Sequence, residues 1–289
     1  GRVYAASQAA VYESVDGGKS WEERFRPPRQ VHLRALAVQG LERPTVLAAT
    51  SRGLFGSFDG GLTWSKVFGA PGEEASDCTV VGFHPADLHR AVLGTRRGVF
   101  VSADGGRTWQ EADVPQAARD VVHAAFHPRE PARLYVVTSD GLFAGDLVSG
   151  SWQRLRTVMH AEETAVEQPA PVDTSAAGEE NGSLHRLSAV AVDPEQPGAL
   201  YLATSRGVEV SADGGLTWRR LSRSGLESAD VTDIVLQHYS PLALYAATAR
   251  GVARYEPAHE RWVALAQGRS ATRVHDLAVG GGQLWGATD

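Results

Sequence analysis

Apolar residues along this chain occur in short runs separated by glycine, proline and aspartate, and the same order of runs returns several times. Residues 187–221 show one full unit: an apolar run, a proline-containing turn, the run LYLATS, a glycine turn, a short strand, the turn ADGG and a last run that begins at Trp218. Short runs between such turns are typical of β-strands. Outside residues 156–185, no segment sustains the 3.6-residue apolar period of a helix. The pattern therefore predicts an all-β protein with four short strands per unit.

The units repeat with a period of about 44 residues, marked by tryptophans at intervals of 43, 45, 43, 66 and 44 residues. These residues are Trp21, Trp64, Trp109, Trp152, Trp218 and Trp262. Four-stranded units at a fixed period of this length are the signature of a β-propeller, in which antiparallel sheets, or blades, surround an axis. We predict first strands at 31–38, 78–83, 121–126, 186–192, 231–236 and 274–279.

One interval exceeds the others by about 22 residues, and the segment 156–185 accounts for the excess. Its glutamates lie among alanine, proline, serine and glycine, a composition that predicts a flexible acidic insertion. Without that excess the chain spans close to six periods, so we predict a single propeller domain over residues 1–289 with six blades. In this interpretation strand 274–279 completes the blade begun by residues 3–7. The leftover run QLWGATD would belong to a seventh blade if the native chain is longer.

Four units carry nearly the same eight residues: SVDGGKSW at 14, SFDGGLTW at 57, SADGGRTW at 102 and SADGGLTW at 211. The two glycines permit positive φ in a tight hairpin turn, and the aspartate can accept hydrogen bonds from N–H groups of that turn. The tryptophan supplies a large flat side chain that packs against neighbouring strands. Two further units depart from this pattern: GDLVSGSW keeps Asp146, Gly150 and Trp152, and RYEPAHERW keeps only Trp262.

The motif S-x-D-G-G-x-T-W resembles the Asp-box, or bacterial neuraminidase repeat. Sialidases, two-propeller xyloglucanases, the sortilin ectodomain and photosystem II assembly factors carry this repeat. The resemblance implies a propeller fold, and it is nearly silent on function because these families include both glycosidases and non-enzymatic binders. In them the box lies on the outer, lower part of the blade, away from the ligand face. The resemblance therefore implies structural roles for Asp16, Asp59, Asp104 and Asp213.

An arginine recurs in the turns between second and third strands, which read SRG, RRG, SRG and ARG in four units. Propeller ligands usually meet the face formed by these turns and by the residues that lead into each first strand. A ring of arginines on that face would suit carboxylates, phosphates or an acidic protein surface. Duplication of the repeat would also leave solvated arginines at equivalent positions, and this alternative stays open. The candidate rim residues are Arg52, Arg97, Arg206 and Arg250.

Three first strands carry a polar residue where the other three have Ala35, Val80 and Ala189. A buried carboxylate costs stability unless it is paired, so such departures are candidate binding residues. Hydrogen bonds between blades are the structural alternative, and two of the residues could also form a paired-carboxylate site. The three candidates are His123, Asp233 and Asp276, and the aspartates that lead into first strands are Asp77, Asp120 and Asp230.

Composition excludes several other classes of protein. The formal charge is −6 with both signs scattered along the chain, which argues against a nucleic-acid footprint. The one cysteine, Cys78, can form no internal disulfide, and no apolar run is long enough for a membrane span. His123 and His127 are four residues apart, but His127 shares a turn position with His84 and Asp193, each followed by proline. We therefore expect no metal site and no cofactor.

A sialidase would need three arginines, a Tyr–Glu nucleophile pair and an acid aspartate. Arginines are available, but FRPP at 25–28 only faintly resembles the sialidase motif Phe-Arg-Ile-Pro and follows an Asp-box instead of preceding the first one. No Tyr–Glu pair can be assigned from the sequence. A xyloglucanase would need a second propeller to form its cleft.

We therefore expect a non-enzymatic binding or assembly propeller that docks a protein or an anionic or carbohydrate ligand on its arginine-rimmed face. The alternative is a glycoside hydrolase, sialidase-like or another exo-glycosidase, that uses carboxylates on the same face. No catalytic residue is assigned. The family resemblance favours a secreted or periplasmic location.

Overall fold

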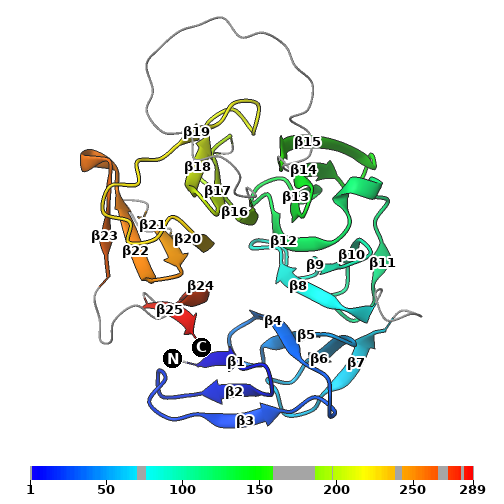
Figure 1. The fold of residues 1–289 in the computed structure, drawn as a ribbon. Coiled ribbons are helices and arrows are strands. Elements are labelled where there is room, and N and C mark those ends of the chain that lie inside the picture. Colours follow the sequence, from blue (N-terminus) through cyan, green and yellow to red (C-terminus); the bar gives the residue numbers. More distant parts are fainter. Residues whose placement is uncertain are drawn as a thin grey trace, which may run out of the picture.

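The computed structural model describes residues 2–69, 76–158, 186–196, 198–237, 243–265, 273–280 and 283–288. Strands account for nearly all of its regular structure, and antiparallel sheets surround a central axis (Figure 1). The first strand of each sheet lies nearest the axis, and the fourth lies at the periphery. The chain is therefore a β-propeller, as the sequence predicts. Its extent as a single domain stays a prediction.

Each predicted strand type is present. The first strands are β4 (Leu33–Gln39), β8 (Cys78–Phe83), β12 (Val121–Phe126), β16 (Leu187–Val192), β20 (Val231–Gln237) and β24 (Val274–Gly280). The second strands are β1 (Val3–Ala6), β5 (Thr45–Thr50), β9 (Ala91–Thr95), β13 (Arg133–Thr138), β17 (Leu200–Thr204), β21 (Ala243–Thr248) and β25 (Gln283–Thr288).

The outer half of the sheets holds the remaining strands and two short 3-10 helices. The third strands are β2 (Val11–Ser14), β6 (Gly53–Ser57), β10 (Val99–Ser102), β14 (Gly141–Asp146), β18 (Gly207–Ser211) and β22 (Gly251–Glu256). The fourth strands are β3 (Glu22–Phe25), β7 (Ser65–Phe68), β11 (Gln110–Glu111), β15 (Ser151–Thr157), β19 (Arg219–Arg220) and β23 (Arg261–Ala264). The helices are η1 (Gln116–Ala118) and η2 (Pro257–His259).

The ring closes differently from the six-blade interpretation. Among the described residues, β24 pairs only with β25, and β1 pairs only with β2, so strand 274–279 does not complete the first sheet. Five four-stranded sheets are joined by a three-stranded sheet, β1-β2-β3, and a two-stranded sheet, β24-β25. The described residues thus form seven sheets, two of them with fewer than four strands. β25 follows β24 closely in the chain and pairs with it as a hairpin.

Packing shows that β24-β25 occupies a blade position of its own. At two Asp-boxes, the third residue of the second strand of the preceding sheet packs on the second glycine of the box. A Cβ atom placed on Gly106 would lie 2.7 Å from Leu47 Cδ1, and one on Gly18 would lie 2.9 Å from the ring of Trp285. Trp285 therefore packs on the Asp-box of the β1-β2-β3 sheet in the same way that Leu47 packs on the Asp-box of the β8–β11 sheet. The two partial sheets are neighbours in the ring, not halves of one blade.

The predicted insertion begins later than the sequence suggests. Strand β15 continues to Thr157, and Val158 is 6% exposed, so residues 156–158 belong to the fourth blade. The rest of the segment, residues 159–185 with all of its glutamates, lies outside the described residues.

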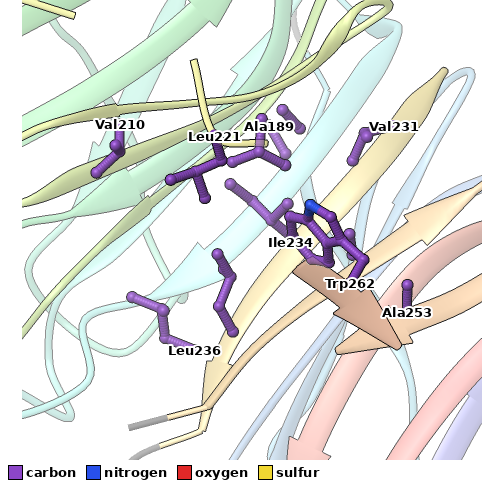
Figure 2. Packing of buried hydrophobic residues seen from close by; sticks show 12 residues of the cluster. Ala189, Val210, Leu221, Val231, Ile234, Leu236, Ala253 and Trp262 are labelled. Atoms are coloured by element: carbon purple, nitrogen blue, oxygen red, sulfur yellow. The ribbon is translucent and has the colours of Figure 1, made fainter. Parts of the chain in front are cut away.

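Sheets pack face to face through apolar side chains, and each interface forms its own cluster. Between the β16–β19 and β20–β23 sheets, Trp262 is 2% exposed and packs with Leu221 and Ile234 (Figure 2). The Trp262 ring donates a hydrogen bond to the carbonyl of Ser222 at 2.8 Å. The sixth unit, which lacks the aspartate of the box, thus still uses its tryptophan to fasten two blades.

The Asp-boxes are closed hydrogen-bond networks at hairpin turns. Asp104 accepts bonds from the Ser102 hydroxyl at 2.8 Å and from the N–H and hydroxyl of Thr108 at 2.9 and 2.6 Å. Gly105 and Gly106 have φ of 72° and 90°, in the left-handed region that favours glycine. Both oxygens of this carboxylate are thus engaged within the turn, as expected of a structural residue. The four boxed aspartates share this arrangement.

Protonation of the boxes should weaken the fold in acid. Hydrogen bonds from Thr63 and Thr217 lower the pKa values of Asp59 and Asp213 from 3.8 to about 2. A carboxyl whose folded pKa lies below its unfolded pKa stabilises the fold above the unfolded value, and that contribution is lost as the pH falls from about 4 toward about 2. We expect the urea midpoint to fall steeply over this range, and less steeply in the double variant Asp59→Asn, Asp213→Asn. Parallel pH profiles for the two proteins would contradict this role.

Candidate functional site

The turns between second and third strands lie beside the residues that lead into the first strands. Backbone bonds join them: Ser51 N–H donates to the His32 carbonyl at 2.9 Å, and Ser205 N–H donates to Arg186 at the same distance. Ala249 N–H likewise donates to the carbonyl of Asp230 at 3.2 Å. Together these segments form one end of the ring, which we call the turn face. The Asp-boxes lie at the opposite ends of the same strands, on what we call the Asp-box face.

The four predicted rim arginines occupy equivalent turns on the turn face. In each turn a threonine hydroxyl at the end of the second strand bonds to the glycine carbonyl that follows the arginine; for Arg52, Thr50 Oγ1 donates to Gly53 at 2.6 Å. The same hydroxyl accepts the arginine N–H, at 3.2 Å for Arg52 and 3.1 Å for Arg97. The backbone of the turn is therefore fixed while the side chain is left outside. Arg52, Arg97 and Arg250 are exposed, and Arg206 is partly buried.

Arginines that the sequence analysis did not single out hold the aspartates of this face. Arg96 Nε lies 2.7 Å from Asp77 Oδ2, and its Nη1 lies 3.5 Å from Asp120 Oδ1. Arg273 Nη2 lies 2.9 Å from Asp230 Oδ2, and Arg186 contacts the other oxygen of that carboxylate. The sequence marks these arginines only by position: Arg96 is next to Arg97 in the RRG turn, and Arg186 and Arg273 each directly precede a first strand.

These ion pairs give Asp77, Asp120 and Asp230 a positioning role in the face. Asp77 and Asp230 each bridge two arginines from neighbouring turns or strands, and Asp120 pairs with Arg96 alone. The carboxylates are thus neutralised and the guanidinium groups are held in place. Side chains of Arg96 and Arg186 remain 50% and 53% exposed. The turn face therefore carries more arginine than aspartate, although the whole chain has a net charge of −6. Its arginines include Arg34, Arg52, Arg96, Arg97, Arg186, Arg206, Arg250 and Arg273.

His123 and Asp233 make the same contact at the same repeat position. Every first strand has a bulge between its first and third residues, and both side chains stand at the third residue. His123 Nδ1 accepts the N–H of Val190 on the next sheet at 3.4 Å, and Asp233 Oδ2 accepts the N–H of Leu277 on the next sheet at 2.8 Å. Both polar residues thus satisfy a backbone donor of the following first strand, which is the structural alternative raised by the sequence.

Asp233 and Asp276 lie close enough for their carboxyl groups to influence each other electrostatically. Asp233 is 7% exposed, whereas Asp276 is exposed. Burial, followed by the charge of Asp276 and the hydrogen bond with its side chain, raises the pKa of Asp233 well above 3.8. Burial lowers the pKa of His123, and the charge of Asp276 opposes that effect. The polar residues of β12, β20 and β24 therefore influence one another electrostatically.

A pair of carboxyl groups is what glycoside hydrolysis requires. Retaining glycosidases hold their two carboxyl groups about 5 to 5.5 Å apart, and inverting enzymes hold them further apart to admit a water. Two surface cavities of the described residues, of about 260 and 200 Å³, are lined by other residues, with Arg119 in the first and Glu13 in the second.

A Tyr–Glu contact exists, on the Asp-box face. The Tyr4 hydroxyl lies 3.0 Å from Glu13 Oε1 and 2.9 Å from the Gly60 carbonyl of the next Asp-box. Arg2 and Arg24 hold the same glutamate at 2.8 and 2.6 Å. Burial and the glutamate raise the pKa of Tyr4 to about 12. These contacts link the β1-β2-β3 sheet to the Asp-box of the next sheet.

His127 acts at a turn, as its repeat position predicts. Its Nδ1 accepts N–H bonds from Arg129 and Glu130 at 3.2 and 2.9 Å, and Asp193 accepts the equivalent bonds from Glu195 and Gln196. Within the described part of the chain, no group of three histidine, cysteine or acidic residues is arranged to hold a metal ion. No helix of those residues is long and apolar enough to cross a membrane.

Replacement of Asp233 by asparagine should stabilise the protein in a pH-dependent way. A carboxyl whose folded pKa is raised contributes full stability below the unfolded pKa of 3.8, and this is lost as the pH rises toward the folded pKa. Asparagine keeps an acceptor for Leu277 N–H without the charge. We expect the urea midpoint of Asp233→Asn to exceed that of the natural sequence by more at pH 7.5 than at pH 4. Asp233→Ala leaves the N–H of Leu277 without an acceptor, so its free energy of unfolding should be lower by about 1 to 3 kcal/mol. An Asn effect of equal size at both pH values would refute the raised pKa.

Comparison with known proteins supports the fold. Residues 52–153 match the family described as "Sortilin, neurotensin receptor 3". No curated protein matches the sequence. Among solved structures, the GH74 xyloglucanase from Xanthomonas campestris has a TM-score of 0.66 and 21% identity, over 99% of this chain and 48% of that one. The chain spans about half the length of the GH74 enzymes it matches.

Two further structures are equally similar in fold. YCF48 bound to a D1 peptide has a TM-score of 0.69 and 16% identity, over 99% of this chain and 86% of that one. The extracellular domain of a putative hybrid two-component system from B. thetaiotaomicron has a TM-score of 0.69 and 13% identity, over 100% and 37%. Identities this low show the fold alone. The chain is thus an Asp-box β-propeller, similar in fold to sortilin-type, GH74 and YCF48 propellers.

Proposed function

We propose that this propeller is a non-enzymatic binding or assembly module that docks an anionic ligand or an acidic protein surface on its turn face. The observation that carries the proposal is charge segregation. A chain of net charge −6 presents a cluster of arginines on one face, and ion pairs to Asp77 and Asp230 orient part of that cluster. Fixed guanidinium groups suit recognition of carboxylates because less side-chain freedom is lost on binding.

The rim arginines supply the part of the face that is free to bind. Among the described residues, the side chains of Arg52, Arg97 and Arg250 make no hydrogen bond or ion pair, and all three are exposed. Their turns hold them at equal places on three sheets. His123, Asp233 and Asp276 lie deeper, on the first strands, where they would meet only a segment that reaches toward the axis.

Two observations on known structures support this mode of action. YCF48 is a single propeller of similar length whose structure was solved with a bound peptide. The extracellular domain from B. thetaiotaomicron has the same fold, which supports an extracytoplasmic setting for the present chain as part of the proposal.

A glycoside hydrolase remains the second candidate, on the similarity to GH74 enzymes and on the Asp233–Asp276 pair. A buried carboxyl whose pKa is raised, beside a second carboxyl, resembles the pairs from which enzymes build an acid and a base. The cavities of about 260 and 200 Å³ are lined by residues other than this pair, and the arginine cluster of the turn face is the reason to prefer binding over hydrolysis. A screen of fluorogenic glycosides would separate the two: turnover that Asp276→Asn abolishes would establish the hydrolase.

Charge reversal on the rim should abolish docking. We expect the triple variant Arg52→Glu, Arg97→Glu, Arg250→Glu to bind a fluorescein-labelled hexaglutamate peptide at least tenfold more weakly than the natural sequence at low salt, because three attractive charges become repulsive. Arg206 is left unchanged because it is partly buried. Anisotropy titrations at two salt concentrations measure the effect, which should shrink as salt rises.

The matched control makes the same charge change on the Asp-box face, with Lys19→Glu, Arg43→Glu and Arg129→Glu, all exposed. It should bind the peptide nearly as the natural sequence does. Equal weakening in both triple variants would show a general charge effect and would overturn the proposed face.

A further inference from the structure

Two buried histidines hold turns at the Asp-box end of their sheets. His84 and His127 directly follow the first strands β8 and β12, and each is 1% exposed. His84 Nδ1 accepts the N–H groups of Ala86 and Asp87 at 3.0 and 2.9 Å. His127 Nδ1 accepts the equivalent pair at 3.2 and 2.9 Å. Because a ring nitrogen accepts only when it carries no proton, both turns require a neutral imidazole with its proton on Nε2.

The equivalent turn of the β16–β19 sheet uses a carboxylate as its acceptor. Asp193 follows β16, and its Oδ1 accepts the N–H groups of Glu195 and Gln196 at 2.8 and 3.1 Å. A carboxylate ordinarily stays ionised down to about pH 5 and so keeps its acceptor oxygens. An imidazole ordinarily binds a proton at about pH 6 to 7, and Nδ1 then becomes a donor. One kind of turn is thus built with two acceptors that respond differently to acid.

Hydrogen bonds join the two histidine turns to each other and to an Asp-box. Arg90 Nη1 in the first turn donates to the carbonyl of Pro131 in the second at 3.3 Å. Arg90 Nε also lies 3.2 Å from Asp87 Oδ2 within its own turn. The Gly105 N–H of the Asp-box in the same sheet donates to the His89 carbonyl at 2.8 Å. A change in one turn can therefore reach the other turn and the Asp-box beside it.

Charged groups from both turns face the rings. Burial lowers the pKa of His84; the backbone of His127 and the charge of Asp87 oppose this effect, and the charges of Arg90 and His127 add to it. Glu130 Oε1 lies 3.6 Å from His127 Nε2. A histidine whose folded pKa lies below its unfolded value of 6.5 stabilises the fold above that pH, and its contribution is lost as the pH falls through the folded pKa.

We propose that His84 and His127 form an acid-released latch on the Asp-box face, closed near neutral pH and open below about pH 6. A proton bound at Nδ1 removes the acceptor of two backbone N–H groups, and a buried cation is unfavourable in a site 1% exposed. Each charged ring therefore rotates out and its turn opens. The latch lies at the opposite end of the blades from the turn face, so it stands whether or not the turn face binds a ligand.

The opening also uncovers apolar surface. The His84 ring packs edge-on against the ring of Phe126, with centroids 5.2 Å apart, and Phe126 is 7% exposed. When the His84 ring leaves, that part of Phe126 meets solvent. A fall in pH is thus converted into a local opening and a new apolar surface on the Asp-box face.

Amide exchange measured by NMR on the full chain tests the latch. We expect the protection factors of the Ala86 and Asp87 N–H groups to fall at least tenfold between pH 7 and pH 5, and those of Arg129 and Glu130 to fall with them. The Asp-boxes lose their contribution only below about pH 4, so they do not act in this range. Equal protection at the two pH values would overturn the latch.

Matched variants show whether the histidines are the sensors. The double variant His84→Asp, His127→Asp copies the acceptor of Asp193 into both turns, and its protection factors should not change between pH 7 and pH 5. His89→Asn removes an exposed histidine from the first turn and should behave as the natural sequence does. Circular dichroism verifies that each variant folds. A loss of protection in the double variant equal to that of the natural sequence would overturn the proposal.

The reverse exchange gives a test that does not depend on the double variant. Asp193→His should make the protection of the Glu195 and Gln196 N–H groups fall at least tenfold between pH 7 and pH 5. A histidine turn that stays protected at this position would overturn the mechanism.

Dye binding tests the release of Phe126. The fluorescence of ANS, which binds exposed apolar surface, should rise between pH 7 and pH 5 with the natural sequence and stay constant with the double variant His84→Asp, His127→Asp. The titration of Asp233 is common to both proteins and cancels in this comparison. An equal rise in both would indicate general expansion in acid and would overturn the release.

Discussion

The constraint on which this structure depends is that every first strand turns one backbone edge toward the axis, where it has no ladder partner of its own. Buried backbone groups must be satisfied, and the side chains of three first strands, β8, β12 and β20, bond to backbone groups of the first strand in the next sheet. Thr79 donates to the carbonyl of Val121, and Thr232 donates to that of Val274. His123 and Asp233 accept N–H groups in the same way. Hydrogen bonds from side chains of one first strand to the backbone of the next therefore link neighbouring blades near the axis.

This constraint explains why the repeat is strict at its periphery and variable at its centre. At the periphery the Asp-box satisfies its own turn, so nearly the same eight residues serve four of the sheets regardless of the neighbouring sheet. At the centre the third residue of a first strand has to suit a particular neighbour. Where that position is Ala35, Val80 or Ala189, no side-chain acceptor is offered; where it is His123 or Asp233, one is. The cost appears in the raised pKa of Asp233, since a carboxyl that accepts one N–H still loses its water.

Sequence reasoning succeeded where the signal is local. The strands, the box hairpins and the turn role of His127 all follow from residues within a few positions of one another, and each was predicted. The departures at His123, Asp233 and Asp276 were also found, because an aligned repeat shows which residue is unusual. The sequence left open what those departures do, since their partners, Val190 and Leu277, stand more than forty residues away or on another strand of unknown register.

The ring closure could not be predicted for a related reason. A period fixes the number of units along the chain, and it does not decide which of two second strands pairs with the last first strand. Residues 3–6 and 283–288 have the same pattern, so both are suitable partners for β24 by composition. Pairing of β24 with β25 is favoured over pairing with β1 because closing a loop of a few residues costs less conformational entropy than closing one of the whole chain. Among the described residues, β1 therefore pairs only with β2, and Leu36 of the neighbouring first strand is partly buried.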